Sequence, residues 1–365
     1  MSLLYNLEQR QIGDNARRVL EAGYSPGLLK DLLLEKGQYD AAVWSLCRDS
    51  GWTALAIPEA YGGLGLSLID LCLIADAMGR VVGGVPFLTS SDAAAQALLL
   101  GGDEALMAEL LPALASGCRT GTIAFAEAGE SVPRYPALRY RNGHVDGAKG
   151  GVLAGAWAEL IVVLAATADG PVLAVVDSSD GGVTREVLNS YDNSRGLAML
   201  RFDGARARVL SRVDASSRAW QVLERAAVVL AAEQVGGADR CLELARNHAI
   251  DRRAFGQPIG AFQAIKHRIA EMYVANQIAR ANCLEAALLI HSGMDGAAMA
   301  AAARISAIEA YDLATREGIQ VFGGMGVTWE SDMHLHLRRA RSTASLFGSR
   351  LIWEDRLVSV LEQLA

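Results

Sequence analysis

The sequence lacks the residue patterns that define several large classes of protein. Its 5 cysteines are scattered without a Cys-x-x-Cys pair, which argues against a disulfide scaffold and a cysteine zinc site. No His-Glu-x-x-His motif or carboxylate cluster accompanies its histidines, which include His334 and His336. We therefore expect a reduced protein without a metal site, in which the histidines are surface or packing residues.

An excess of basic charge is also missing. The 34 lysines and arginines are outnumbered by 41 acidic residues, and the net charge of −7 disfavours binding to nucleic acid or to an anionic membrane. The longest apolar run, residues 156–166, is interrupted by Glu159 and is too short to span a bilayer. The first residues show no basic region followed by an apolar core. These features predict a cytoplasmic protein without a membrane anchor.

What the sequence does have is a large apolar fraction arranged in three regions. Hydrophobic residues make up 52% of the 365 residues, enough for a sizeable core. Residues 1–118 and 214–365 show helical spacing, whereas 119–213 contains short β-rich runs and a hairpin signal at Asn142-Gly143. We predict a mainly α protein with an N-terminal helical domain, a middle β-domain of sheet or barrel type, and a C-terminal four-helix bundle.

The first candidate site is the stretch RRAFGQPIGAFQAIKH, residues 252–267, which interrupts a helical pattern with two glycines and a proline. One interpretation places Arg252 and Arg253 in solvent and Phe255 in the core. The other assigns the arginines to a phosphate or pyrophosphate, because a planar guanidinium donates to two oxygens at once. The stretch alone leaves both interpretations open.

The second candidate site is GIQVFGGMGVTWE, residues 318–330, where Gly323, Gly324 and Gly326 follow a helical pattern. A glycine at this position is typical of a helix C-cap. Three glycines within four positions are more than one cap requires, which favours a backbone that approaches a ligand closely.

These two stretches, with PEAYGGLGLS and the helical–β–helical order, resemble the acyl-CoA dehydrogenase family over nearly the whole chain. RRAFGQPIGAFQAIKHRIAEM is similar to the family's R-x-x-F-G-x-x-x-x-x-x-Q segment, and QVFGGMGV is similar to its Q-x-x-G-G-x-G segment. The resemblance implies an FAD flavoprotein of lipid metabolism. In this oxidoreductase chemistry a carboxylate removes the Cα proton of an acyl-CoA thioester while the flavin takes a hydride from Cβ.

The resemblance also implies that this chain contacts the ADP half of an FAD seated in a neighbouring subunit. The residues that match those contacts by position are Arg252, Phe255, Gln263, Gln320, Gly323 and Gly324.

The catalytic carboxylate of the family has no counterpart here. In ARSTASLFGSR, Phe347 stands where the glutamate of the family's Y-E-G-T segment is expected, and phenylalanine cannot accept a proton. Some members place the base on the first bundle helix instead, at a position that corresponds to Ala226. Glu224 is a weak replacement candidate, because two residues along a helix turn the side chain by about 200°. The alternative interpretation of Glu224 is a solvated helix charge.

The contacts to a flavin on the chain's own β-domain are also lost. In FAEAGESVP, Glu127 remains from the family's T-E-P-x-x-G-S-D segment, but the proline and the Gly-Ser-Asp run do not. Gly151 stands where a tryptophan packs on the flavin, and Leu153 where a threonine donates a hydrogen bond to it. Neither residue supplies the ring or the hydroxyl.

This pattern resembles the non-catalytic half of the α2β2 enzymes that act in bacterial breakdown of steroid CoA thioesters. We therefore expect an acyl-CoA dehydrogenase subunit in a dimer or tetramer. It would share an FAD across the interface with a family-related partner that carries the catalytic glutamate. Two alternatives stay open: a self-sufficient dehydrogenase with a displaced base such as Glu224, and a protein that binds acyl-CoA without catalysis.

Overall fold

The structure is a computed structural model that describes residues 5–364. The chain forms two compact units, each assembled from separate segments. The helical unit comprises the residues up to Lys30, Leu68–Gly83, and the residues from Ala227 onward. The sheet unit comprises Asp31–Ser67 and Gly84–Ala226. In the described part of the chain, no helix combines the length and apolar character needed to cross a membrane.

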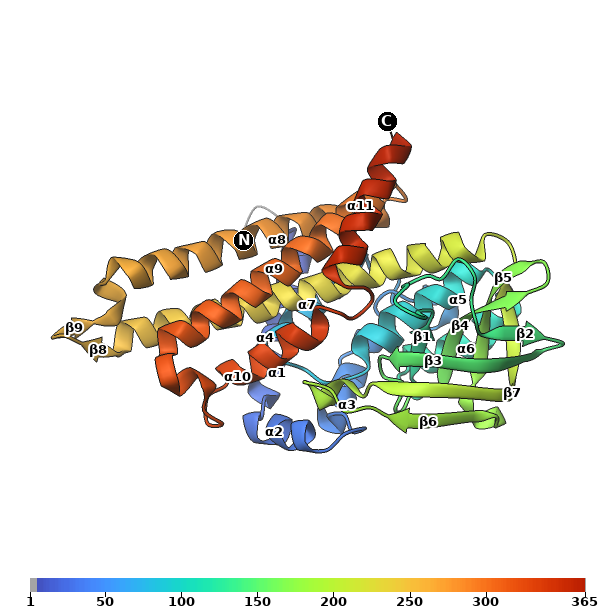
Figure 1. The fold of residues 1–365 in the computed structure, drawn as a ribbon, viewed down its shortest axis with the longest axis horizontal. Coiled ribbons are helices and arrows are strands. Elements are labelled where there is room, and N and C mark those ends of the chain that lie inside the picture. The colour runs from blue at the N-terminus through green and yellow to red at the C-terminus, as the bar shows by residue number, and fades with distance from the viewer. Residues whose placement is uncertain (1–4, 365) are drawn as a thin grey trace. The chain divides into compact units, whose positions relative to one another are not determined.

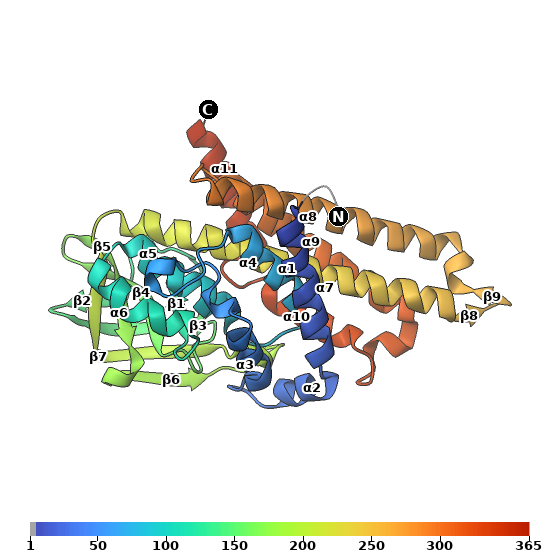
Figure 2. The same cartoon turned by 180° about the vertical axis from the view of Figure 1, so that it is seen from behind.

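The helical unit is built around long helices that run side by side (Figure 1). Its helices are α1 (Leu7–Gly23), α4 (Leu68–Arg80), most of α7 (Ala215–Asp251), α8 (Gln263–His291), α9 (Ala297–Phe322), α10 (Met333–Thr343) and α11 (Arg350–Leu364). The view from behind shows α1 and α4 against the longer helices (Figure 2). The predicted C-terminal helical bundle is confirmed.

Small residues let these helices approach closely. A Cβ atom on Gly79 of α4 would lie 1.8 Å from the Glu233 carbonyl oxygen of α7, and one on Gly236 of α7 would lie 1.9 Å from the Asp76 carbonyl oxygen. Both clashes are with backbone atoms, so a side chain at either position would push α4 and α7 apart. α9 contributes the buried alanines 300, 303, 307, 310 and 314 at helical spacing.

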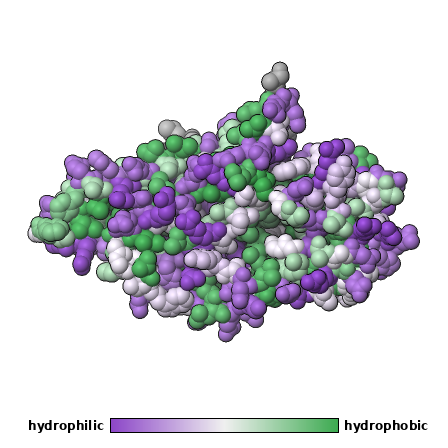
Figure 3. All heavy atoms as spheres, viewed as in Figure 1, coloured by the Kyte–Doolittle hydropathy of each residue, from purple (hydrophilic) through white to green (hydrophobic). Residues whose placement is uncertain are grey.

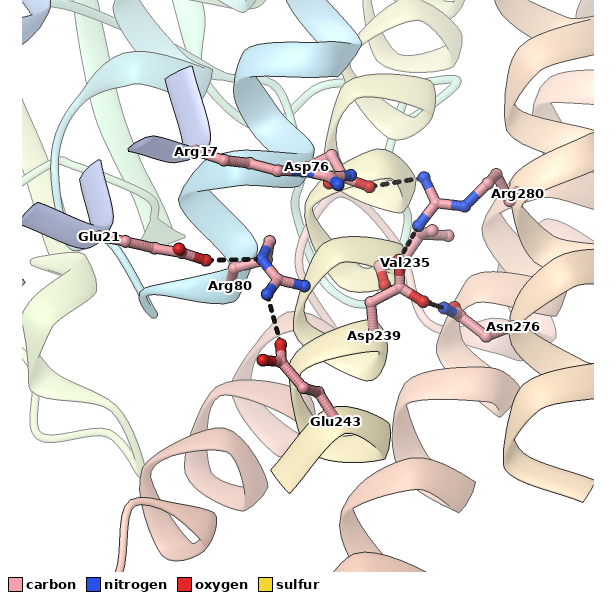
Figure 4. Close-up of polar contacts among 9 residues, drawn as sticks. All are labelled: Arg17, Glu21, Asp76, Arg80, Val235, Asp239, Glu243, Asn276 and Arg280. Atoms are coloured by element: carbon pink, nitrogen blue, oxygen red, sulfur yellow. Dashed lines mark hydrogen bonds and ion pairs between the residues drawn. The ribbon is translucent and has the colours of Figure 1, made fainter. Parts of the chain in front are cut away.

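A buried network of charges connects four of these helices (Figure 4). Arg280 of α8 donates to Asp76 of α4 at 2.7 Å and also to Asp239 of α7, while Arg17 of α1 donates to Asp76 at 2.8 Å. Asn276 completes the group by donating to Asp239. Burial alone would raise the pKa of Asp76, but Arg280 and Arg17 together hold it below its usual value. The network therefore fixes α7 and α8 to each other.

The two histidines singled out in the sequence pack inside the helical unit. His336 is buried with Nδ1 2.9 Å from the Tyr311 hydroxyl, and His334 stacks on Trp329. Burial, with the nearby Arg240, lowers the pKa of His336 to about 3, so its ring is neutral. The prediction that these are packing residues is confirmed.

The sheet unit contains a small barrel. Its strands are β1 (Gly121–Ala124), β2 (Arg139–Arg141), β3 (His144–Val152), β4 (Leu160–Thr167), β5 (Gly170–Asp177), β6 (Val183–Val187) and β7 (Ala198–Ser211). The pairings β4–β2, β2–β3, β3–β7, β7–β5 and β5–β4 close a ring, and β1 and β6 pair at its edges. The predicted turn joins β2 to β3, with Asn142 and Gly143 both at positive φ as a two-residue hairpin turn requires.

The sheet unit also contains several helices, and a π-helix among them was not foreseen. They are α3 (Ala41–Asp49), α5 (Ala95–Gly101) and α6 (Glu104–Ala115), and α2 (Pro26–Leu34) lies at the boundary of the two units. Before α5 the chain forms a π-helix, Phe87–Ala94, in which all eight residues are buried. Within it Asp92 pairs with Arg225 of α7 at 2.9 Å, so the buried carboxylate is not left alone.

Candidate functional site

The first candidate stretch forms an exposed hairpin between two long helices. α7 ends at Asp251, and β8 (Arg253–Ala254) pairs with β9 (Gln257–Pro258) before α8 begins at Gln263. Phe255 and Gly256 form the turn, with φ of 53° and 82°. The interpretation of Phe255 as a core residue is wrong, because its side chain is 95% exposed. A bulky residue at positive φ is strained, and the one aromatic contact of Phe255 in the described chain, edge-on to Phe262 with ring centroids 6.2 Å apart, leaves its side chain almost fully exposed.

The second stretch lies at the same end of the helical unit (Figure 1). His248 near the end of α7 stacks on Phe322, the last residue of α9, with ring centroids 4.2 Å apart. Gly323 has φ of 62° and donates its N–H to the Gln320 carbonyl, so it caps α9 as one interpretation predicts. The two glycine-containing segments are therefore neighbours in space although about 60 residues separate them in sequence.

The three glycines differ in the space around them. A Cβ atom on Gly323 or Gly324 would meet nothing within 4 Å, whereas one on Gly326 would lie 3.0 Å from atoms of Ile319 and Phe322. Gly326 is required by packing. Gly323 and Gly324 leave the backbone open to whatever lies outside, which agrees with the prediction that a ligand approaches it.

Polar groups able to hold a phosphate remain free at this end. Arg252, Gln263 and Gln320 are exposed, and none of their side chains has a hydrogen bond or ion pair with another residue that the structure describes. Burial and the adjacent Arg252 lower the pKa of His248, so its ring is neutral near pH 7. The positive charge of the first stretch therefore comes from Arg252, Arg253 and Lys266, and of these the arginines are well suited to a pyrophosphate.

Sequence reasoning missed the apolar residues that surround these polar groups. Figure 3 shows hydrophobic residues gathered at the end of the molecule where the β8–β9 hairpin lies. The exposed apolar side chains near the two stretches are Ile250, Phe255, Met325, Val327 and Trp329. An apolar rim around free polar groups is typical of a surface covered by another chain. The signal available in the sequence was the adjacency of these apolar residues to the glycine and arginine motifs.

Phe347, which replaces the expected base, lies in the link between α10 and α11. The residue is half-buried at φ of 55°, and Gly348 follows at 110°. The fully buried Arg304 of α9 donates to the carbonyl oxygens of Thr343 and Leu346, so it fixes this link in place. Burial lowers the pKa of Arg304 to about 9. The link is therefore well anchored, but it presents no proton acceptor at position 347.

The alternative base position lies on the part of α7 that belongs to the sheet unit. Ala226 is fully buried. Glu224 is only 7% exposed and takes part in polar interactions, so its interpretation as a solvated helix charge is wrong. A lone carboxylate on a helix gives no sequence signal for burial, because its environment is set by distant segments.

The segment that should contact a flavin from the first strand is closed into a tight turn. Glu127 and Glu130 exchange both backbone hydrogen bonds across Ala128 and Gly129, which have φ of 47° and 90°. The Glu127 carboxylate accepts from the backbone N–H of Leu138 and pairs with the fully buried Lys149 at 2.5 Å. This glutamate is used by the barrel itself.

The second flavin segment is likewise shaped for the barrel. The β3–β7 pairing shifts register between Lys149 and Val152, and Gly151 lies in this bulge at φ of 62° with nothing within 4 Å of its Cβ position. Leu153 is buried, and its carbonyl accepts from the Thr122 hydroxyl at 2.6 Å. The sheet unit therefore does not fit a flavin ring in the way the family does, whereas the free groups of the helical unit fit the phosphates of FAD.

Known proteins match this chain along almost its whole length. Family models describe residues 6–118 as an acyl-CoA dehydrogenase N-terminal domain and residues 217–358 as the C-terminal domain. Acyl-CoA dehydrogenase IpdE2 of Mycolicibacterium smegmatis is 31% identical over 344 residues, covering 93% of this chain and 94% of the relative.

Solved structures share the same fold. A variant of the steroid acyl-CoA dehydrogenase Tcur3481-Tcur3483 superposes with a TM-score of 0.89 at 26% identity, covering 98% of both chains. The ChsE4-ChsE5 complex of Mycobacterium tuberculosis gives 0.88 at 24% identity, covering 99% of this chain and 98% of that one. The chain therefore belongs to the acyl-CoA dehydrogenase family, whose members are oxidoreductases that generally bind FAD.

Proposed function

We propose that this chain is the non-catalytic subunit of a heteromeric acyl-CoA dehydrogenase and completes the FAD site of a family-related partner. The observation that carries the proposal is the contrast between two sets of residues. Those that reach a neighbour's FAD are present, exposed and free, whereas the base and the contacts to the chain's own flavin are absent. The partner would supply the carboxylate that removes the Cα proton.

Each retained residue has a role that its position allows. Arg252 and Gln263 would donate to the pyrophosphate, and the open backbone at Gly323 and Gly324 would admit its oxygens. Phe255 would pack on the partner, which would bury a ring that its edge-on contact with Phe262 leaves 95% exposed in this chain. Bound FAD supplies the hydride acceptor of the reaction. The contribution of this chain is to hold that cofactor and exclude water from it.

The known structures support a partner of the same family. Both solved neighbours described above carry the names of two proteins, Tcur3481 with Tcur3483 and ChsE4 with ChsE5. Tcur3481-Tcur3483 is named as a steroid enzyme, so we extend the proposal to a bulky acyl-CoA substrate.

The test compares the chain produced alone with the chain co-produced with a family member that has an intact Y-E-G-T segment. FAD content is read from flavin absorbance, and dehydrogenation is followed with an artificial electron acceptor. We expect little flavin and little turnover from the chain alone, and one stable flavin-containing complex from the pair. Full FAD occupancy with rapid dehydrogenation by the lone chain would overturn the proposal.

A second candidate function is favoured by one observation. Glu224 is a buried carboxylate on α7, two residues from the position at which some members of the family place the base. A self-sufficient dehydrogenase that uses Glu224 would lose its activity on substitution by glutamine, which separates it from the first proposal.

A further inference from the structure

The helical unit contains a small polar cavity that has no role in the function proposed above. Its volume is about 110 Å³, and it lies where the ends of α1 and α4 meet α7 and the start of α10. Exposed Glu21 and buried His336 both line it, so it reaches from the surface into the unit. Its charged and polar lining residues are Glu21, Tyr24, Arg80, Arg240, Asp332 and His336. We call it the α1–α10 cavity.

The carboxylates at the α1–α10 cavity already have cationic partners. Arg80, at the end of α4, donates through Nε to Glu21 at 3.0 Å and through Nη2 to Glu243 at 2.5 Å (Figure 4). Glu243 also pairs with Nη1 of Arg240 at 3.2 Å. The remaining carboxylate, Asp332, lies 3.9 Å from a lysine ammonium group of α2. These carboxylates are therefore balanced within the chain and do not need a cation from a ligand.

The groups without partners at this cavity are hydrogen-bond donors. Within the described chain, Nη1 of Arg80 and both Nε and Nη2 of Arg240 have no hydrogen bond or ion pair. The Tyr24 hydroxyl has no partner there either. Burial, with Asp332 nearby, raises the pKa of Tyr24, so its hydroxyl keeps its proton. A ligand with acceptor oxygens would satisfy these donors together.

His336 adds a ring nitrogen at the buried end of the cavity. The residue is 1% exposed, its Nδ1 lies 2.9 Å from the Tyr311 hydroxyl, and its Nε2 has no hydrogen bond in the described chain. Burial and the nearby arginines keep the ring neutral, so it carries one proton. When the Tyr311 hydroxyl donates to Nδ1, Nε2 carries that proton and donates it into the cavity. A buried polar nitrogen without a partner at a cavity wall indicates a ligand there.

We propose that the α1–α10 cavity binds a small carboxylate. A planar carboxylate accepts two hydrogen bonds from a guanidinium and keeps lone pairs for a tyrosine hydroxyl and an imidazole N–H. A cavity of about 150 Å³ can hold benzene, so one of about 110 Å³ suits an anion of the size of acetate and excludes a nucleotide, a flavin or an acyl-CoA. The paired charges around the cavity cancel, which favours a singly charged carboxylate over inorganic phosphate. Bound there, the anion would connect α1, α4, α7 and α10 and stabilise the helical unit.

The experiment measures binding to the full chain, alone and in its complex, by isothermal titration calorimetry and by the midpoint of thermal unfolding. The probes are acetate, acetamide and inorganic phosphate, compared at equal ionic strength. Acetamide has nearly the shape of acetate but no charge. The variants are Arg240→Gln and Tyr24→Phe, and Arg246→Gln is the matched control. Arg246 is an exposed arginine of the same helix, α7, and does not line the cavity.

We expect acetate to bind with a dissociation constant of about 1 mM or below and to raise the unfolding midpoint as its concentration increases. Acetamide should bind at least about tenfold more weakly, because it lacks the charge. Arg240→Gln should weaken acetate binding by at least about tenfold, since charge-assisted hydrogen bonds are lost, and Tyr24→Phe by about three- to tenfold. Arg246→Gln should change the affinity less than about twofold, since its charge lies outside the cavity.

A second measurement reads His336 without substituting this buried residue. In ¹⁵N NMR of the histidine-labelled chain, acetate should shift the Nε2 signal of His336 and leave the proton on Nε2. An Nε2 signal that acetate leaves unchanged overturns the proposal, as do absence of acetate binding and equal binding of acetamide. Tighter binding of phosphate than of acetate, or an equal loss of affinity in Arg246→Gln, also overturns it. FAD content of the complex is read separately, so failure here is distinguishable from failure of the proposed function.

Discussion

The outer end of the helical unit and the flavin segments of the sheet unit differ in what their residues do for this chain. In the sheet unit, the positions that would contact a flavin have become ordinary barrel structure: Ala128 and Gly129 close a tight turn, and Leu153 is buried. At the end of the helical unit, Phe255 is strained and exposed, and Arg252 is free. The residues of the sheet unit stabilise the chain's own barrel. Phe255 and Arg252 add little to the stability of the chain by itself.

This difference indicates where the function lies. A non-glycine residue at positive φ costs of order 1–3 kcal/mol, and a nearly fully exposed phenylalanine with one edge-on aromatic contact recovers little of it within the chain. A residue such as Phe255, which lowers the stability of the isolated chain, is explained by a contact with another molecule. Substitutions in the helical unit should therefore have larger effects than substitutions at the catalytic position.

The largest effect is expected from the buried charge network that fixes α7 and α8 to each other. Arg280→Met leaves Asp76 and Asp239 buried without their shared cation, and breaking such a pair costs about 3–5 kcal/mol. Chemical denaturation should show this loss of stability, with FAD content of the complex falling in parallel because α7 and α8 carry the FAD motif. Arg240→Met is the control, because its ion pair with Glu243 is partly exposed and is worth less than about 1 kcal/mol. Equal losses in the two variants would contradict the role given to the network.

Arg252→Gln should weaken FAD binding to the complex by about 10- to 100-fold and leave the unfolding midpoint unchanged, since the side chain has no partner in the described chain. FAD titration followed by flavin fluorescence measures the affinity. Arg246→Gln serves as the control, because Arg246 is an exposed arginine of α7, the helix that ends just before Arg252. Unchanged FAD affinity in Arg252→Gln would remove the motif from the cofactor site.

Much of the fold could be predicted because it follows from local periodicity. The long helical patterns, the β-rich middle and the Asn142-Gly143 turn depend on residues close together in sequence. The candidate FAD residues came from motif resemblance. The sequence did not reveal that these residues are exposed. It also did not reveal that the two stretches meet at one end of the helical unit through the His248–Phe322 contact.

The errors have a common physical cause. One of the two open interpretations of Phe255 placed it in the core because apolar residues are usually buried, and one of the two for Glu224 placed it in solvent because charged residues usually are not buried. The network of Arg17, Asp76 and Arg280 joins segments more than 200 residues apart, so no window of sequence reveals it. The π-helix Phe87–Ala94 has no periodicity of its own that sequence patterns register.

A smaller effect is expected from Gly323→Ala, which sharpens the comparison through a matched pair of glycines. Gly323 and Gly62 both have positive φ and open space at the Cβ position, but Gly62 lies in the sheet unit. Gly62→Ala should cost roughly 1–2 kcal/mol of stability from its left-handed backbone, and Gly323→Ala should cost more, because φ of 62° with ψ of −143° is close to a region that essentially only glycine adopts. FAD affinity should fall about tenfold in Gly323→Ala alone, because the methyl group covers the open backbone. A fall of equal size in Gly62→Ala would mean that general destabilisation is the cause.

The smallest effects are expected when the catalytic position is changed. Phe347→Glu restores the missing carboxylate, yet the lone chain should remain without dehydrogenase activity, because Gly151 and Leu153 still cannot hold a flavin. Glu224→Gln in the complex should leave the turnover rate per bound FAD unchanged, measured beside the unfolding midpoint because Glu224 is buried. Removal of a true general base would lower that rate by about 10²–10⁴-fold. Such a loss would place the base on this chain and make the sheet unit, rather than the helical end, its catalytic contribution.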